Sequence, residues 1–277
     1  MTSYDHDNRH LAEIYDRISD SQFEGGKRIV ERLGIKAGHR VLDVGCGTGR
    51  LACWIRECVG PSGTVVGIDP LVERIAVARN RNSDIHFAVG SAEDLGCFPD
   101  ESFDAVCLSA VFHWINDKPK ALAEIRRVLC PGGRLGCTTS PKELHLVGTV
   151  PIICASVLCR SPYLETLEPS VVDGMFGHLT TTELVNLLIE QHFELIELHL
   201  MRRMQTLKSG EDVVDFAESS SFGNFLSLVP EDLRASLRAD LAETFDKNRE
   251  DNGIMLSQFG TLFVAERGHD QQRNTEP

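Results

Sequence analysis

Three glycines stand at alternate positions directly after a short apolar run, and this stretch could bring a ligand against the chain. The run covers residues 41–44, and Gly45, Gly47 and Gly49 follow it. An apolar, β-branched run that meets glycines is typical of a buried strand that turns sharply into a helix. Glycines lack the Cβ atoms that would hold a flat ligand away, and the first N–H groups of a helix can donate to polar ligand atoms. The stretch therefore favours the binding of a nucleoside-like ligand at bare backbone.

The acidic residue Asp69 follows the next apolar run and offers a different kind of contact. It ends the strand that we predict over residues 64–68. A carboxylate at the end of the second strand can accept two hydrogen bonds from the vicinal hydroxyls of a ribose. The same carboxylate could cap the helix predicted over residues 71–80, and the two roles are compatible. Open α/β folds hold ligands at the carboxyl ends of their strands, so we expect Asp69 and the glycine turn to lie together.

Glycine spacing separates two classes of nucleotide-binding protein. The dinucleotide fingerprint G-x-G-x-x-G would require a glycine at position 50, which is Arg50. The pattern D-x-G-x-G-x-G, from Asp43 to Gly49, instead resembles motif I of class I methyltransferases that use S-adenosylmethionine. The Phe-His-Trp run at residues 112–114 is similar to the small-molecule members of that class, of the trans-aconitate, malonyl-carrier-protein and ubiquinone types. Residues 121–134 resemble the family's segment L-x-E-I-x-R-V-L-x-P-G-G-R-L, and the resemblance runs from about residue 41 to residue 138.

The resemblance implies an α/β fold: a Rossmann-like three-layer sandwich around a seven-stranded, mostly parallel sheet whose last strand is antiparallel, with helical cap insertions. N-terminal lid helices are expected over residues 1–35 and a single methyltransferase domain over residues 36–267. Cap insertions are expected at about 141–180 and 205–255, and a disordered tail at 268–277. Apolar runs predict strands at residues 41–44, 64–68, 85–89, 102–109, 134–138, 193–198 and 259–265.

The resemblance also implies the cofactor, S-adenosylmethionine, with S-adenosylhomocysteine as its product. Tyr15 stands where small-molecule methyltransferases carry an aromatic lid residue; its ring could lie against the sulfonium charge, or it could equally pack on the domain. Ser91 stands where the family commonly has an aspartate for the adenine amino group, and a hydroxyl can accept that hydrogen bond more weakly. The expected cofactor contacts are Tyr15, Asp43, Gly45, Cys46, Gly47, Gly49, Asp69, Pro70, Ser91, Ala92 and Ser109.

Residues that follow the fourth strand are candidates for the acceptor side, because the end of that strand lies across the switch point from the glycine turn. His113 could accept a proton from an acceptor hydroxyl or could only orient it, but histidine beside tryptophan is also a helix-packing pattern. His145 is a second candidate for the same role. Phenylalanines of the second cap insertion could form apolar walls, although each one alone could equally be core. The expected acceptor contacts are Phe112, Trp114, Phe216, Phe222 and Phe225.

Composition limits the partners of the protein. Lys plus Arg number 28 against 41 Asp plus Glu, so the formal net charge is −13, which disfavours nucleic acid. No apolar stretch reaches the roughly 18 residues of a membrane span, and the first residues are polar, so we expect a cytoplasmic monomer or homodimer without a membrane partner. The 9 cysteines include no C-x-x-C pair and are interpreted as buried reduced thiols. No metal is expected, and a thiol cluster for zinc or arsenic is the alternative.

These observations predict an enzyme that transfers a methyl group from S-adenosylmethionine to a small, apolar molecule of specialised metabolism. The reaction would be an in-line displacement at an oxygen or nitrogen acceptor, and the protein would mainly align the reacting atoms and exclude water. Three alternatives stay open. A nucleotide-dependent oxidoreductase would also use Asp69 on a ribose. A regulatory subunit would bind the cofactor without turnover. An arsenite-type thiol methyltransferase would need converging cysteines such as Cys154 and Cys159.

Overall fold

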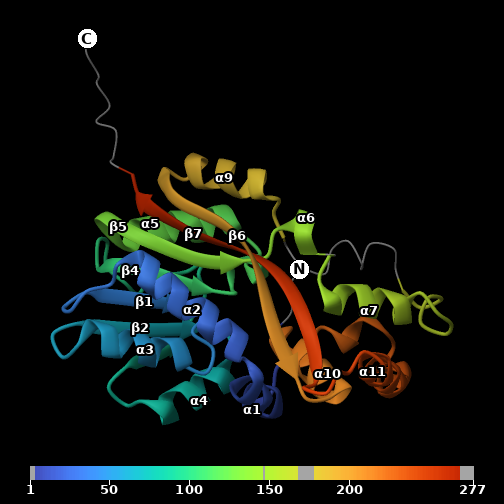
Figure 1. The fold of residues 1–277 in the computed structure, drawn as a ribbon. Helices are drawn as coiled ribbons and strands as arrows, with labels where there is room; N and C mark the ends of the chain where they lie inside the picture. The colour runs from blue at the N-terminus through green and yellow to red at the C-terminus, as the bar shows by residue number, and fades with distance from the viewer. Residues whose placement is uncertain (1–3, 146, 168–177, 269–277) are drawn as a thin grey trace.

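A seven-stranded sheet lies between two layers of helices in the computed structural model, which describes residues 4–145, 147–167 and 178–268 (Figure 1). The strand order is β3-β2-β1-β4-β5-β7-β6. This arrangement confirms the Rossmann-like α/β fold expected from the sequence. The strands are β1 (Arg40–Val44), β2 (Thr64–Asp69), β3 (His86–Val89), β4 (Phe103–Ser109), β5 (Leu129–Thr139), β6 (Phe193–Leu207) and β7 (Ile254–Arg267).

The central strands are parallel and buried on both faces, as their continuous apolar runs require. β1 pairs in parallel with both β2 and β4, and β2 and β4 pair in parallel with β3 and β5. Val41 and Leu42 of β1 have no exposed surface. Because the strands point the same way, their carboxyl ends share one edge, where the Gly45 N–H donates to the Ile68 carbonyl across 2.7 Å. The glycine loop and the end of β2 therefore lie side by side.

The last two strands are longer than the sequence predicts. β7 runs antiparallel to both β5 and β6, as expected for the last strand. Its pairing with β6 continues without a break from His199↔Leu262 to Leu207↔Ile254, beyond the end of β5. The distal half of β6 carries long polar and sulfur-containing side chains instead of a clear apolar alternation, which is why its strand character is hard to predict. The β6–β7 hairpin thus extends beyond the sheet into the region of the expected cap. The segment between the two strands, residues 208–253, is shorter than the predicted insertion at 205–255.

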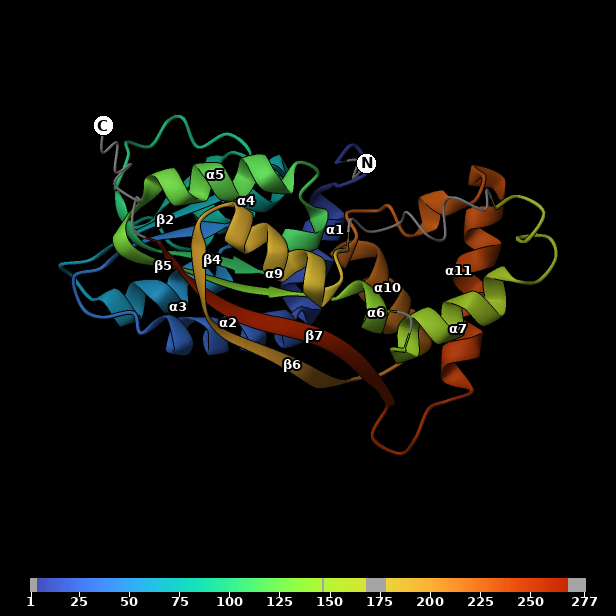
Figure 2. The ribbon, with the colours of Figure 1, turned by 90° about the horizontal axis from the view of Figure 1, so that it is seen from above.

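Two hydrophobic clusters hold the helices against the sheet (Figure 2). One cluster joins apolar side chains of α2, α3 and α4 to one face of the sheet. The other joins those of α5 and α9 to the opposite face. This is the three-layer sandwich that the sequence predicts. The helices are α2 (Asp20–Leu33), α3 (Arg50–Val59), α4 (Val72–Arg81), α5 (Lys118–Val128) and α9 (Thr181–Glu190).

Both cap insertions pack into one helical body beside the carboxyl edge of the sheet (Figure 1). A third hydrophobic cluster joins Cys154 and Val157 of the first insertion to Phe216 and Leu241 of the second. Residues 146 and 168–177, which belong to the first expected insertion, lie outside the described residues. The cap elements are α6 (Lys142–His145), α7 (Thr149–Leu158), α10 (Gly210–Ser220), the 3₁₀ turn η2 (Leu226–Leu228) and α11 (Glu231–Asp246).

The N-terminal helix α1 (Arg9–Ile18) lies against the cap helix α10 and against α4. It begins after Asn8, whose side chain accepts a hydrogen bond from the Leu11 N–H at 3.0 Å. The helix therefore bridges the cap and the sheet domain. Of the expected tail, the residues from 269 onward lie outside the described part of the chain. No helix among the described residues is long and apolar enough to cross a membrane.

Candidate active site

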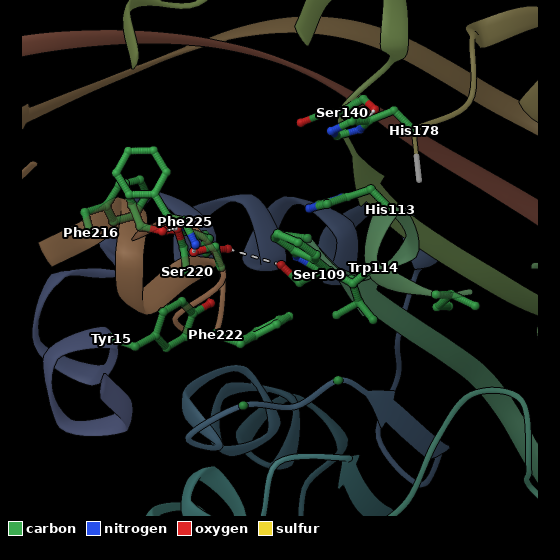
Figure 3. Close-up of a pocket in the computed structure, with 18 of the residues that line it drawn as sticks. Tyr15, Ser109, His113, Trp114, Ser140, His178, Phe216, Ser220, Phe222 and Phe225 are labelled. Atoms are coloured by element: carbon green, nitrogen blue, oxygen red, sulfur yellow. Dashed lines mark hydrogen bonds between the residues drawn. The ribbon is translucent and has the colours of Figure 1, made fainter. Parts of the chain in front are cut away.

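A cavity of about 310 Å³ lies between the carboxyl edge of the sheet and the cap (Figure 3). Its wall combines the loops that follow β1, β2 and β4 with helix α1, the strands β6 and β7, and the helices α7 and α10. The volume falls in the range of small-molecule sites. Residues predicted for the cofactor and residues predicted for the acceptor meet at this one cavity.

The glycine loop owes its shape to left-handed backbone angles at all three glycines, where φ lies between 54° and 80°. A Cβ atom at Gly45 would lie 2.3 Å from a methyl group of Val111, and one at Gly49 would lie 2.9 Å from a neighbouring aromatic ring. Packing therefore demands glycine at both positions. A Cβ at Gly47 would meet only Tyr15, at 3.6 Å. Gly45 and Gly47 both line the cavity, and Gly47 is the less crowded of the two, so it offers bare backbone to a ligand.

Asp69 joins the glycine loop to the start of α4. Its Oδ2 accepts a hydrogen bond from the Gly47 N–H at 2.8 Å, and its Oδ1 accepts one from the Leu71 N–H at 2.9 Å. Burial raises the pKa of the carboxyl, while the charge of Arg74 and the two backbone donors oppose that rise. The residue lines the cavity. The N-cap residue of α4 is Leu71, and no side chain among the described residues caps this helix, so the capping role predicted for Asp69 is wrong.

Asp43 and Cys46 lie beneath the glycine loop and do not line the cavity. Asp43 is buried, and within the described residues its Oδ2 has no hydrogen-bond partner. Burial and the nearby charge of Asp69 raise the pKa of Asp43 to about 8. The side chain of Cys46 packs in the core, and its N–H donates to the Ile68 carbonyl at 2.9 Å. Together with Gly49, these residues shape the loop from behind.

The other predicted cofactor residues reach the cavity wall. Ser91 donates its hydroxyl to the carboxylate of Glu93, and that hydroxyl also accepts the Glu93 N–H at 3.2 Å. Glu93 itself lines the cavity, which the sequence did not indicate. The side of the cavity that is expected to hold adenine therefore carries two polar groups, the Ser91 hydroxyl and the Glu93 carboxylate. The predicted cofactor residues that line the cavity are Tyr15, Gly45, Gly47, Asp69, Pro70, Ser91, Ala92 and Ser109.

Arg74 of α4 connects the lid helix, the cap and the cavity. Its guanidinium lies over the ring of Tyr15, 4.4 Å from the centroid, and 4.9 Å from that of Phe222. It forms a 3.1 Å ion pair with Asp7 and donates to the carbonyl of Ser219. Burial raises the pKa of Tyr15. Arg74 could not be predicted as a site residue, because its partners come from segments far apart along the chain.

The 3₁₀ turn η1 (Phe112–Trp114) points its three side chains in different directions. Phe112 is 2% exposed, packs edge-on against Phe263 at 6.4 Å between centroids, and does not line the cavity. Its predicted contact with the acceptor is therefore corrected: the tight turn directs it into the core. His113 and Trp114 do line the cavity, and the indole lies 4.9 Å from the Phe222 ring.

His113 faces the cavity beside a second histidine, His178, that the sequence did not indicate (Figure 3). The two rings stack at 5.2 Å with an interplanar angle of 18°. His113 Nδ1 lies 3.2 Å from Thr139 Oγ1. His178 Nδ1 lies 2.8 Å from the Ser140 carbonyl, which can only accept, so this nitrogen carries the proton. The side chain of His145 lies outside the described residues, and its role stays a prediction.

Cap residues make the remaining wall apolar. Phe216, Phe222 and Phe225 line the cavity, as predicted for the second insertion. Of the cysteines, only Cys154 lies on this wall, while Cys159 is exposed. The described residues contain no group of His, Cys, Asp and Glu side chains that could hold a metal ion. The converging thiols required by an arsenite-type enzyme are therefore not brought together.

Comparison with known proteins identifies the family. Residues 42–137 match the model of a methyltransferase domain family. The ubiquinone/menaquinone biosynthesis C-methyltransferase UbiE of Hahella chejuensis is 39% identical over 136 residues, which are 45% of this chain and 54% of that protein. The 2-phytyl-1,4-beta-naphthoquinone methyltransferase of Arabidopsis thaliana is 33% identical over 205 residues, which are 66% of this chain and 77% of that protein. The chain belongs to the class I S-adenosylmethionine-dependent methyltransferases.

Similarity to a solved structure extends over more of the chain than the sequence matches do. The YcgJ protein of Bacillus subtilis superposes with a TM-score of 0.57 at 20% identity, covering 89% of this chain and 99% of that one. This likeness concerns the fold alone. The match to UbiE spans about half of that protein's length. The match to the family model ends at residue 137, before the cap. The family and its cofactor are thus established, while the acceptor is not.

The cavity residues of this methyltransferase fit S-adenosylmethionine. The cofactor carries a ribose with vicinal hydroxyls, a sulfonium charge and an amino-acid end. Asp69 offers a carboxylate for the hydroxyls, and Gly47 leaves room for close approach of a ligand. The aromatic ring of Tyr15 also lines the cavity and can face a sulfonium.

Proposed function

We propose that this methyltransferase acts on an apolar aromatic small molecule that carries a hydroxyl group. The observation that supports this most is His113, held at Nδ1 by Thr139 and turned toward the cavity. A hydroxyl acceptor of high pKa needs such a base, whereas an acceptor that arrives deprotonated does not. The names of the two relatives, a quinone-biosynthesis C-methyltransferase and a phytyl-naphthoquinone methyltransferase, agree with a ring-containing acceptor.

The wall contributed by the cap supports an apolar acceptor. The carboxylates on the cavity wall, Asp69 and Glu93, both lie on the sheet domain, at the expected cofactor side. An ammonium acceptor would find no carboxylate among the described cap residues that line the cavity, so we favour oxygen or an activated ring carbon over nitrogen. The described apolar cap residues of the wall are Val150, Pro151, Ala155, Leu158, Leu167, Phe216, Ala217, Phe222, Phe225 and Leu228.

The residues divide the chemistry between proton transfer and alignment. S-adenosylmethionine supplies an electrophilic methyl group with a good thioether leaving group. The imidazole of His113, which lines the cavity, takes the proton of the acceptor hydroxyl, and Thr139 keeps the ring oriented. The negative charge left on the acceptor can react at oxygen or, through the ring, at the neighbouring carbon. Trp114 and the cap phenylalanines hold the ring and exclude water.

The test uses cofactor with a heavy-isotope methyl group and three matched acceptors: a naphthohydroquinone with an apolar side chain, the same ring without the chain, and the corresponding aminonaphthalene. We expect labelled product from the hydroquinones, faster with the side chain, and NMR of the product distinguishes methylation at carbon from methylation at oxygen. Faster turnover of the amine would contradict the proposal. Transfer into any component of a metabolite extract would exclude a purely regulatory role.

Variants connect the reaction to the site. His113→Gln should reduce turnover by about 10²–10⁴-fold, the usual contribution of a general base. The affinity for S-adenosylhomocysteine should stay the same, because His113 is not expected to touch the cofactor. His86→Gln, at an exposed position on β3, is the matched control. Equal turnover of His113→Gln and wild type would remove the basis for a hydroxyl acceptor.

A further inference from the structure

Arg203 is a cationic residue in the cavity wall that the proposed reaction does not use. It lies in the distal half of β6, where it is paired with Gln258 of β7 beyond the end of β5. Both residues line the cavity. In the strand order of the sheet, β6 lies at the edge opposite to β2 and β3. The hairpin thus places a guanidinium on the side of the cavity away from these two strands.

This guanidinium has no anionic partner in the structure. Within residues 4–145, 147–167 and 178–268, Arg203 makes no hydrogen bond or ion pair, and its Nε is buried without a partner. Burial and the like charge of Arg28 lower its pKa. A buried, unpaired charge is costly unless a partner satisfies it. Arg74, the other arginine of the cavity wall, differs because Asp7 neutralises it.

Two glycines leave space for the guanidinium. A Cβ atom at Gly25 of α2 would lie 3.3 Å from Arg203 Nη1. One at Gly260 of β7 would lie 3.1 Å from Nη2. Side chains at either position would crowd the group, so the chain provides a slot for it between α2 and β7. A slot that holds an unpaired cation against a ligand cavity is what an anion-binding residue requires.

The neighbours of this slot place it toward the glycine loop. On α2, Gly25 is followed by Gly26, where a Cβ would lie 3.1 Å from Ser109 Oγ at the end of β4. β4 is the strand next to β1, which carries the glycine loop. Arg203 is also close enough to Tyr15 for the two groups to interact electrostatically. The carboxylates of the cavity wall, Asp69 and Glu93, stand on the β2 and β3 side.

We infer that Arg203 binds the carboxylate of the amino-acid end of S-adenosylmethionine. The carboxylate is the anionic group of this cofactor, and the Asp69 side of the cavity would repel it. Charge therefore orients the cofactor, with its ribose toward Asp69 and its carboxylate toward Arg203. The inference rests on S-adenosylmethionine occupying this cavity. It makes the cap-supporting hairpin, and not only the glycine loop, part of the cofactor site.

Calorimetry with two ligands tests the inference. S-adenosylhomocysteine carries the carboxylate, whereas 5′-methylthioadenosine has the same adenosine and sulfur but no amino-acid end. Arg203→Met should weaken S-adenosylhomocysteine binding by about 10- to 100-fold, the range for a charge-assisted hydrogen bond, and leave methylthioadenosine binding unchanged. Arg203→Lys should recover part of the affinity. Arg202→Met, on the exposed neighbouring position of β6, should change neither.

Three results would overturn the inference or its basis. Unchanged S-adenosylhomocysteine binding by Arg203→Met would show that the arginine serves another anion, such as one on the acceptor. Equal weakening of both ligands would show a structural effect. Failure of the wild type to bind either ligand would refute the cofactor site itself. The melting temperature of the ligand-free variant separates these cases from misfolding: it should equal or exceed the wild-type value, because Arg203→Met removes an unpaired buried charge.

Discussion

The contact between Arg74 and Asp7 should decide whether the N-terminal helix stays closed over the cavity. Arg74→Met keeps the length of the side chain but removes its charge, its ion pair with Asp7 and its hydrogen bond to the Ser219 carbonyl. The side chains of Arg74 and Asp7 are only 3% and 4% exposed, so water cannot replace the lost partner in the closed state. We expect the variant to release α1 from α4 and α10.

The magnitude follows from the geometry of the pair. At the observed 3.1 Å separation of the charged atoms, an effective dielectric constant of about 20 corresponds to a Coulomb attraction of roughly 5 kcal/mol. Desolvation offsets part of this attraction, but removing one partner of a buried pair leaves the other uncompensated, at a cost of about 3–5 kcal/mol. Asp7→Asn in the Arg74→Met background should recover part of that loss, with a coupling energy of about 2 kcal/mol.

Hydrogen exchange measures the opening of α1 directly. This opening is a local event, and a measurement of global unfolding would partly hide it. Amides of residues 9–18 should exchange faster in Arg74→Met, while those of β1 should not change. The four proteins of the double-mutant cycle give the coupling energy from the protection of α1. A coupling energy within about 0.5 kcal/mol of zero, or equal acceleration in β1, would refute the reasoning that this buried pair holds the lid.

Two further predictions concern Asp43 and the η1 turn. The pKa of Asp43 is raised to about 8, so unfolding releases a proton between pH 4 and pH 8, and the free energy of unfolding falls by about 1.4 kcal/mol per pH unit as pH rises through that window. Asp43→Asn should flatten the fall in melting temperature between pH 4 and pH 8. An unchanged slope would contradict the raised pKa of Asp43. Phe112→Ala should lower the free energy of unfolding by about 3–5 kcal/mol in urea titrations, whereas Trp114→Ala should mainly weaken acceptor binding; the opposite pattern would show that Phe112 is the acceptor contact.

The sheet domain could be predicted from the sequence because its signals are local. Apolar runs such as residues 41–44 are buried on both faces of a parallel sheet, and the glycines that follow are required by packing and by positive φ. The family resemblance then supplied the number of strands, the antiparallel last strand and the cofactor. β6 and β7 extend beyond their predicted bounds because their distal halves pair with each other. The mixed side chains of these halves explain why the extension was not predicted. Pattern reasoning cannot detect a strand such as the distal half of β6, where exposed and half-buried positions alternate but apolar and polar residue types do not.

The candidate site was only partly predictable, and the residues that were missed share one cause. Arg74, Arg203 and His178 acquire their positions from contacts with segments that are remote in sequence. Nothing in their own neighbourhoods distinguishes them from surface residues. Phe112 shows the converse problem, because a 3₁₀ turn sends adjacent side chains to opposite sides, and a motif cannot tell which of them faces the ligand.

The continuous β6–β7 hairpin also constrains how this enzyme could be re-engineered. The same two strands complete the sheet at one end and carry the cap at the other, from Phe193↔Arg267 to Leu207↔Ile254. A chimaera that exchanged whole strands would therefore disturb the domain core together with the acceptor chamber. Junctions placed inside residues 208–253 would keep the ribbon intact and would graft a new acceptor chamber onto an unchanged methyl-donor site. The hairpin thus supplies a fixed support on which the segment between its strands can be exchanged.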